Sequence, residues 1–126
     1  MKTKLTYTGI RVKDLDASVN FYTKLLGMKE TGRNTIEAAK GVVVSLASEE
    51  GGHEIELNFY PKDSKFYSEY IPGEGLDHLA FKVENLDRAL EEAAKAGHPT
   101  VLDMKGKTSR WAYIQDPNGI YIELFA

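Results

Sequence analysis

The sequence predicts an α+β fold of two tandem βαβββ modules within a single domain, residues 1–126. One observation concerns the start of each half: residues 76–83 precede Leu86-Asp87 as residues 5–12 precede Leu15-Asp16, an offset of 86 − 15 = 71. A second concerns the end of each half, where residues 54–57 (Glu-Ile-Glu-Leu) match residues 121–124 (Tyr-Ile-Glu-Leu), an offset of 123 − 56 = 67. Each half therefore opens with a strand and a helix and closes with an Ile-Glu-Leu strand, the pattern of an internal repeat.

The first module covers about residues 4–60, with the element order β-α-β-β-β. Strands are predicted over residues 5–12, 28–34, 41–47 and 54–60, with a turn at 48–52. Asp14 or Asp16 can cap the helix, and Gly27 lies where a left-handed C-terminal residue is expected. Apolar residues recur at helical spacing and predict its buried face: Leu15, Val19, Tyr22, Leu25 and Leu26.

A polar and aromatic linker, residues 61–74, precedes the second module, residues 75–126. We favour a surface crossover for this linker over a flap above a pocket, since loops of this length serve both purposes. Strands are predicted over residues 76–83, 98–104, 110–115 and 120–125, with turns at 106–109 and at the Asp-Pro-Asn-Gly of 116–119. Asn85 caps the predicted helix and Gly97 ends it. Its expected inward residues are Leu86, Ala89, Leu90, Ala93 and Ala94.

Composition excludes several classes of function. The net charge of −3, without a basic run, argues against a general role in nucleic-acid binding. The absence of cysteine excludes disulfides, thiolate nucleophiles and zinc–thiolate sites. No apolar stretch approaches the ~20 residues of a membrane span, and no apolar segment follows the charged N-terminus as in a signal peptide. We therefore expect a cytoplasmic protein with no membrane partner.

The internal repeat selects a group of polar side chains. Modules paired about a pseudo-twofold axis bring equivalent positions together, and the two offsets then gather four residues: Tyr7, Glu56, His78 and Glu123. A single glutamate on a half-exposed strand usually faces solvent, so the argument depends on the match between the halves. Two neighbouring carboxylates repel each other unless a cation or a shared proton compensates, and with a histidine beside them we predict a divalent metal ion. The remaining histidines, His53 and His98, are expected at the surface.

Three segments resemble the vicinal-oxygen-chelate superfamily of glyoxalases, bleomycin resistance proteins and dioxygenases, in particular its small glyoxalase I-like members. They are residues 9–15 (Gly-Ile-Arg-Val-Lys-Asp-Leu), 75–81 (Gly-Leu-Asp-His-Leu-Ala-Phe) and 116–123 (Asp-Pro-Asn-Gly-Ile-Tyr-Ile-Glu). The resemblance implies a half-open barrel around one divalent ion, which could be Zn, Ni, Co, Mn or Fe. It places the ligand positions on the same four residues that the repeat selects. With the exposed sheet edges, it also leads us to expect a homodimer.

The resemblance implies a metal-dependent lyase or isomerase acting on a small oxygen-chelating carbonyl substrate. Glu123 would move a proton between adjacent carbons, and Glu56 would be its symmetry mate. The family has His or Gln where this chain has Tyr7. Since His78, Glu56 and Glu123 already supply a charge of −2, and a phenol ionises only near pH ~10, we predict that Tyr7 stays outside the inner coordination sphere. Its hydroxyl can instead donate a hydrogen bond to a metal-bound water or substrate oxygen.

The implied binding of a cofactor rests on Arg11, which matches the arginine that holds the glutathione carboxylate in glyoxalase I. The family's partner asparagine is replaced here by Tyr60, so glutathione or another thiol remains an open question. A second hypothesis is a non-catalytic binder of the bleomycin and antibiotic type, with a cavity lined by Tyr60, Phe66, Tyr67 and Trp111. A ring-cleaving dioxygenase ranks last, because its iron usually takes two histidines and a carboxylate, whereas His78 alone occupies a ligand position.

Overall fold

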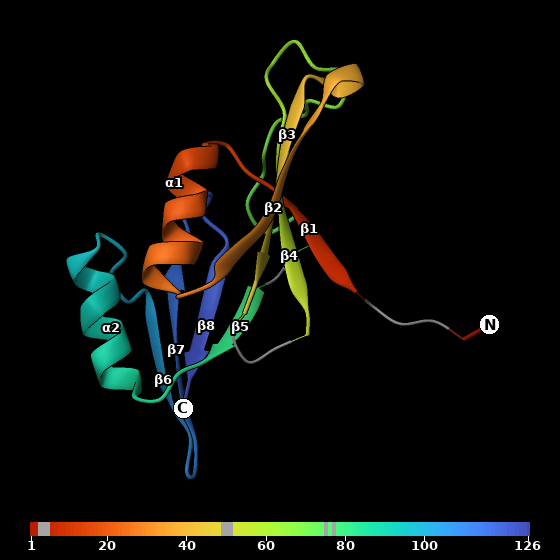
Figure 1. The fold of residues 1–126 in the computed structure, drawn as a ribbon. Coiled ribbons are helices and arrows are strands. Elements are labelled where there is room, and N and C mark those ends of the chain that lie inside the picture. The colour runs from red at the N-terminus through yellow and green to blue at the C-terminus, as the bar shows by residue number, and fades with distance from the viewer. Residues whose placement is uncertain (3–5, 49–51, 75, 77) are drawn as a thin grey trace. The chain divides into compact units, whose positions relative to one another are not determined.

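The computed structural model describes residues 1–2, 6–48, 52–74, 76 and 78–126. It divides into two compact units, Met1–Tyr70 and Ile71–Ala126, each built around one four-stranded sheet (Figure 1). The boundary falls inside the predicted linker, so residues 61–70 belong to the first unit. In the part of the chain that is described, no helix is long and apolar enough to cross a membrane.

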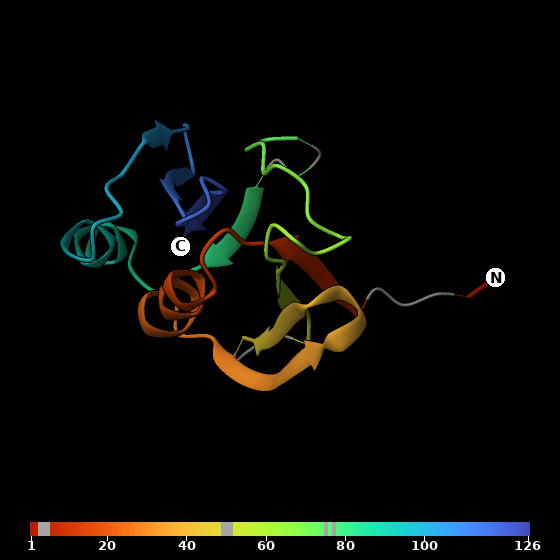
Figure 2. The same cartoon turned by 90° about the horizontal axis from the view of Figure 1, so that it is seen from above.

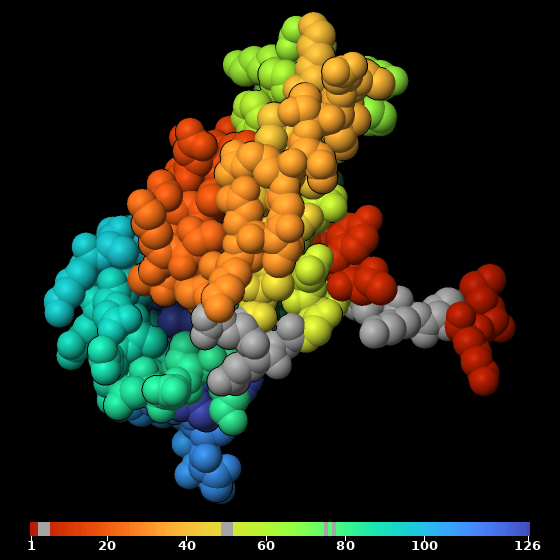
Figure 3. All heavy atoms as spheres, in the orientation of Figure 1, coloured from red at the N-terminus to blue at the C-terminus, as the bar shows by residue number. Residues whose placement is uncertain are grey.

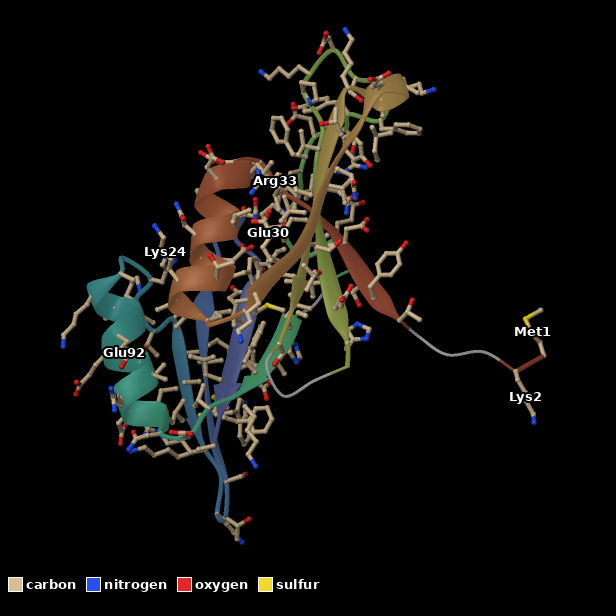
Figure 4. The ribbon with its side chains drawn as sticks, viewed as in Figure 1. Met1, Lys2, Lys24, Glu30, Arg33 and Glu92 are labelled. Carbon is tan, nitrogen blue, oxygen red and sulfur yellow. The ribbon has the colours of Figure 1, made fainter. Side chains whose placement is uncertain are left out.

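The first unit contains a mixed sheet in the order β1-β4-β3-β2. Its strands are β1 (Tyr7–Arg11), β2 (Lys29–Ile36), β3 (Gly41–Ala47) and β4 (Glu54–Phe59). β1 pairs with β4 in parallel and the other pairs are antiparallel. The predicted strands are confirmed with small changes at their ends, whereas the predicted turn at 48–52 lies largely outside the described residues. Figure 4 shows Glu30 and Arg33 on β2, whose side chains form an ion pair of 2.9 Å.

The helix of the first unit packs on β4 and is capped as predicted. It begins as α1 (Leu15–Asn20), where Asp14 Oδ1 accepts a 3.0 Å hydrogen bond from Ala17 N. It then continues as a π-helical turn, η1 (Phe21–Leu25), with Leu26 N donating to Phe21 O. The fully buried positions are Ser18, Phe21 and Tyr22, while the other predicted apolar residues are half-buried. The π turn adds a residue to the helical phase, which regular 3.6-residue spacing does not anticipate.

A short 3-10 turn, η2 (Glu37–Ala39), joins β2 to β3 and was not predicted. Lys40 follows it in the left-handed conformation, with φ of 52°. Two contacts tie this turn to the start of the linker: Lys40 pairs with Asp63, and the Ser64 hydroxyl donates to Ala39 O. The first residues of the linker are therefore held against the β2–β3 connection.

The second unit repeats this topology, with sheet order β5-β8-β7-β6. Its elements are β5 (His78–Lys82), α2 (Leu86–Lys95), β6 (Leu102–Lys105), β7 (Arg110–Gln115) and β8 (Tyr121–Phe125). Again the outer strand, β5, pairs in parallel with β8. Figure 2 shows α2 nearly end-on beside its sheet, where it packs on β7 and β8. The tandem βαβββ prediction is confirmed by these two sheets.

The helix α2 is capped by Asn85, whose Oδ1 accepts a 3.0 Å bond from Arg88 N. Its buried residues are Leu86, Leu90 and Ala93, whereas Ala94, predicted inward, is exposed. Ala94 lies at the edge of a narrow apolar stripe, where helical spacing alone does not distinguish inside from outside. Glu92 lies on the outer face (Figure 4), paired with Arg88.

The predicted strand at 98–104 is shorter than expected, because β6 starts only at Leu102. Gly97 has φ of 90°, and Pro99 has no N–H to donate to a ladder. The backbone N–H of His98 donates to Ala93 O, and its side-chain Nδ1 lies 2.9 Å from Gln115 O. Beyond β6, the exposed hairpin of residues 106–109 protrudes from the second unit (Figure 3).

The turn between β7 and β8 is the predicted Asp-Pro-Asn-Gly segment. Asp116 Oδ1 accepts hydrogen bonds from Asn118 N and Ile120 N, both 2.8 Å, and Oδ2 accepts one of 2.7 Å from Asn118 Nδ2. Asp116 and Asn118 are only 4% and 2% exposed. Gly119 takes φ of 86°, which glycine adopts without strain. This turn sets the register of the two strands that follow and precede it.

Corresponding strands of the two sheets share one register. Tyr7 pairs with Glu54 as His78 pairs with Tyr121, so the same step along the strands brings Gly9 opposite Glu56 and Ala80 opposite Glu123. The sequence offsets of 71 and 67 residues therefore hold at the level of individual residue pairs. His78 is the structural equivalent of Tyr7, and Glu123 of Glu56.

Candidate functional site

His78 and Glu123 lie on the same face of the second sheet. They occupy neighbouring parallel strands two residues apart in register, so strand alternation points both side chains away from α2. His78 Nε2 lies 3.4 Å from Glu123 Oε2. The side chains are 32% and 21% exposed, so the pair is partly shielded from water but reachable from outside.

Tyr113 completes this group and was missed by sequence reasoning. Its hydroxyl donates a 2.7 Å hydrogen bond to Glu123 Oε2. Its ring meets the His78 ring edge-on, with centroids 5.6 Å apart. The predicted hairpin did not bring the two residues together, because a four-residue turn at 116–119 would set Tyr113 opposite Ile122. In the observed register Gln115 pairs with Tyr121, and Tyr113 therefore lies opposite Glu123.

Tyr7 and Glu56 lie on the corresponding face of the first sheet. Their Cα positions are related through the pairs Tyr7–Glu54 and Gly9–Glu56. Tyr7 is 52% exposed, and Glu56 is half-buried on β4. The structure thus brings together His78 with Glu123 in one unit and aligns Tyr7 with Glu56 in the other. The gathering of all four around one point remains a prediction.

The donor set of His78 and Glu123 fits a divalent metal ion. Two ligand atoms about 2.1 Å from an ion lie about 3.0–3.4 Å apart at ligand–metal–ligand angles of about 90–110°. The 3.4 Å spacing of Nε2 and Oε2 matches that range. Within each unit taken alone, the described residues hold no group of three His, Asp or Glu side chains suited to a metal. The addition of Glu56 to this pair as a third ligand stays a prediction.

The other two histidines have local partners. His53 is exposed, with Nε2 2.8 Å from Thr8 Oγ1. His98 is half-buried rather than at the surface, and its Nδ1 contacts the backbone of Gln115. Neither lies on the strand positions that the repeat selects.

A pocket of about 490 Å³ opens in the first unit around the end of β1. Arg11 lies at its wall, with the guanidinium 5.4 Å from the centroid of the Tyr60 ring and a hydrogen bond to the Ser68 hydroxyl. Lys13 lies 5.0 Å from the centroid of the Tyr70 ring. The linker residues 67–70 thus form one side of the pocket and are held to β1 through two cations. The linker that was predicted to be a surface crossover therefore also forms part of the wall of this pocket.

The predicted lining of a binding cavity is only partly found there. Tyr60 and Tyr67 line the pocket, together with Lys62. Phe66 packs on Tyr60 at 5.8 Å between ring centroids but is not among the lining residues. Trp111 belongs to the second unit.

An ion pair at the edge of the second sheet shifts the pKa of a carboxyl group. The hydrogen bond from Arg110 holds the pKa of the Asp103 carboxyl below its usual range, because the positive guanidinium favours the ionised form. Arg110 also pairs with Asp87 on α2. These contacts tie the start of β7 to β6 and to α2, on the face of the sheet opposite Tyr113.

A sequence model of the glyoxalase/bleomycin resistance protein/dioxygenase superfamily matches residues 4–124. The chain is 33% identical to the lactoylglutathione lyase of Escherichia coli O157:H7, over 96% of this chain and 90% of that protein. The chain belongs to this superfamily. The expectation of an enzyme agrees with relatives that carry this name.

Solved structures of the same fold include both enzymes and binding proteins. The trypanothione-dependent glyoxalase I of Leishmania major matches with a TM-score of 0.78 and 28% identity, covering 98% of this chain and 86% of that one. TnmS3, an antibiotic-binding protein of Streptomyces sp. CB03234, matches with a TM-score of 0.75 and 16% identity, covering 98% and 95%. The second likeness shows the fold alone. The tandem glyoxalase-type fold is therefore established, and the reaction has to be argued from the site.

Proposed function

We propose that this protein is a metal-dependent lyase or isomerase of the glyoxalase I type. The observation that carries the proposal is the His78–Glu123 pair, with a ligand-like spacing of 3.4 Å on one face of the sheet. Its support is the matching register of Tyr7 and Glu56 in the first unit and the lactoylglutathione lyases among the relatives. The two modules would act as one domain, residues 1–126.

The reaction is a proton shift between two adjacent oxygen-bearing carbons of a small carbonyl compound. His78, Glu123 and Glu56 would hold the divalent ion, with Tyr7 outside the inner sphere. When bound, such an ion supplies Lewis-acid stabilisation of negative charge on the substrate oxygens.

The chain's own residues account for the proton transfer. Glu123 takes the proton from one carbon and returns it to the next, so no proton is gained or lost overall. Glu123 Oε2 is occupied by Tyr113, whereas Oε1 has no partner among the described residues. Oε1 is therefore the oxygen open to a substrate proton.

The substrate would carry an anionic group that reaches the Arg11 pocket. Three cations, Arg11, Lys13 and Lys62, line it beside one acid, Glu69. Tyr60 stands where the glutathione-binding asparagine of glyoxalase I is expected, so the anion-bearing part need not be glutathione. A small carbonyl compound joined to a different thiol or acid fits these groups.

Glu123→Gln tests the base directly. Gln keeps the shape and an oxygen donor but accepts no proton, so turnover of a hemithioacetal is expected to fall by ~10²–10⁴-fold with the fold unchanged. The assay follows thioester formation from methylglyoxal premixed with a panel of thiols, with Ni²⁺ or Zn²⁺ present. The matched control is Glu91→Gln, an exposed glutamate of α2, which should leave turnover unchanged. Equal turnover of Glu123→Gln and the unaltered protein would exclude Glu123 as the base.

We also propose a cytoplasmic homodimer that binds a small molecule and neither nucleic acid nor membrane. Sedimentation analysis at micromolar concentration tests the dimer. A monomer at all concentrations would contradict it.

A non-catalytic binder is the second candidate, and Tyr7 favours it. A phenol at a ligand position weakens the donor set, and Tyr60 and Tyr67 offer aromatic surface in the pocket. Failure of the unaltered protein to bind any divalent ion would move this candidate to first place. A ring-cleaving dioxygenase is disfavoured further by the contacts of His53 and His98, which leave His78 as the histidine on a ligand position.

A further inference from the structure

Tyr113 touches both members of the candidate pair. Its hydroxyl donates to Glu123 Oε2 at 2.7 Å, and its ring lies edge-on to His78 at 5.6 Å and 88°. A third ring, Tyr121, packs edge-on against it at 6.1 Å. Tyr113 sits on β7, an inner strand of the sheet flanked by β6 and β8, so the backbone that carries the phenol is held on both sides.

The first module has no such phenol. Ser45 pairs with Glu56 as Tyr113 pairs with Glu123, so Ser45 is the equivalent position. Glu56 makes no side-chain hydrogen bond or ion pair with a described residue, so the short Ser45 side chain gives it no counterpart of the Tyr113 bond. The βαβββ unit therefore folds without a phenol at this place. A contact that the scaffold does not require, present only beside the histidine, points to the chemistry of the site.

The hydrogen bond restricts Glu123 in a definite way. It binds one carboxylate oxygen and leaves the other without a partner among the described residues. The bound oxygen is the one that lies 3.4 Å from His78 Nε2. Without the phenol, rotation about the last side-chain bond would exchange the two oxygens, because this torsion is broad and roughly two-fold.

We propose that Tyr113 is a positioning residue for the reaction proposed above, on which this inference rests. Tyr113 keeps Oε2 beside His78 Nε2 as a preformed pair of metal ligands, and it directs Oε1 to the substrate proton. Hydrogen-bond partners of metal ligands commonly change metal affinity or activity by ~10–100-fold when removed. Tyr113 is such a hydrogen-bond partner of Glu123, a proposed metal ligand.

Tyr113→Phe tests the role with two readouts. Calorimetric titration of the metal-free protein with Ni²⁺ or Zn²⁺ is expected to show affinity lower by ~10–100-fold, with a thermal midpoint close to that of the unaltered protein. In the hemithioacetal assay, kcat should fall at saturating metal while KM stays nearly constant, since Tyr113 acts on the base rather than on substrate binding.

Two variants keep the test specific. Tyr121→Phe removes a neighbouring hydroxyl on the same face, which makes no hydrogen bond with a described residue, and should change neither readout. Replacement of Tyr113 by 3-fluorotyrosine keeps the hydroxyl and should keep metal affinity. Loss of affinity in the 3-fluorotyrosine protein as large as in Tyr113→Phe would show that the ring acts through packing, and would overturn the proposal.

The outcomes separate this inference from the proposed function. Unchanged metal affinity and kcat in Tyr113→Phe, with an active metal-binding unaltered protein, overturn the role of Tyr113 alone. Absence of metal binding by the unaltered protein refutes the proposed function, and the role of Tyr113 falls with it.

Discussion

Replacement of Asp116 by Ala is expected to destabilise the second unit strongly. Asp116 accepts three hydrogen bonds, two from the backbone N–H groups of Asn118 and Ile120 and one from Asn118 Nδ2. Both Asp116 and Asn118 are almost fully buried. A buried donor left without a partner costs about 1–3 kcal/mol. Since neighbouring terms do not add fully, the total loss is about 3–5 kcal/mol, a large part of the ~5–15 kcal/mol that holds a domain together.

Asp116→Asn sharpens this prediction. Its Oδ1 still accepts both backbone bonds, while its new amide faces Asn118 Nδ2 and is accommodated if the Asn118 amide turns over. We expect a loss of about 1 kcal/mol, since one charge-assisted bond becomes a neutral one. Urea unfolding of both variants, with the exposed Glu91→Ala as control, gives the order Glu91→Ala, Asp116→Asn, Asp116→Ala by increasing loss. A loss below about 1 kcal/mol for Asp116→Ala would refute the assignment of these bonds as stabilising.

Further predictions concern the ligand positions and a surface ion pair. Calorimetric titration with Zn²⁺ or Ni²⁺ should show that Tyr7→Phe keeps most of the metal affinity and that His78→Ala loses most of it; equal losses would make Tyr7 a true ligand. Tyr7→His should tighten binding, because a neutral nitrogen donor then occupies the fourth position. The pKa of Asp103 is lowered by Arg110, so the pair stabilises the fold above the ordinary aspartate pKa and loses this effect as pH falls through the lowered value. Arg110→Gln should therefore lower the urea midpoint at pH 7 and approach the unaltered protein near pH ~2; an equal deficit at both pH values would contradict the sign.

Periodicity and caps predicted most of the fold because they act locally. The Asn85 side chain caps α2 by accepting a hydrogen bond from Arg88 N, three residues further along the chain. The turn at Asp116–Gly119 is likewise held by hydrogen bonds between residues close in sequence. The match between the two halves of the sequence predicted individual residue equivalences as well as helices and strands. It identified His78 and Tyr7 as equivalent residues, and the registers of the two sheets agree with this. Alternation along β4 and β8 likewise placed Glu56 and Glu123 on the face away from the helices.

Features that depend on side-chain rotamers or on an extra backbone residue escaped the sequence patterns. Tyr113 lies on a strand of ordinary alternating pattern, and its bond to Glu123 arises only across the hairpin. The π-helical turn that begins at Phe21 changes which side of the helix is buried, and no particular residue type in the sequence predicts such a turn. At His98, the backbone N–H donates to Ala93 O at the end of α2 and Pro99 has no N–H, so β6 starts only at Leu102.

The parallel pairing of β1 with β4 and of β5 with β8 has a consequence for the order of folding. In each unit the antiparallel strands are joined by neighbouring turns, whereas the outer parallel strand must wait for all intervening residues to be placed. Closing the longest loop last is the entropically expected sequence of events. The strands that carry Tyr7 and His78 should therefore dock late and open first. Amide hydrogen exchange should be fastest, among the strands, in β1 and β5. A metal ion held by His78 on β5 and Glu123 on β8 should slow exchange in β5 but not in β1, where Tyr7 is outside the inner sphere.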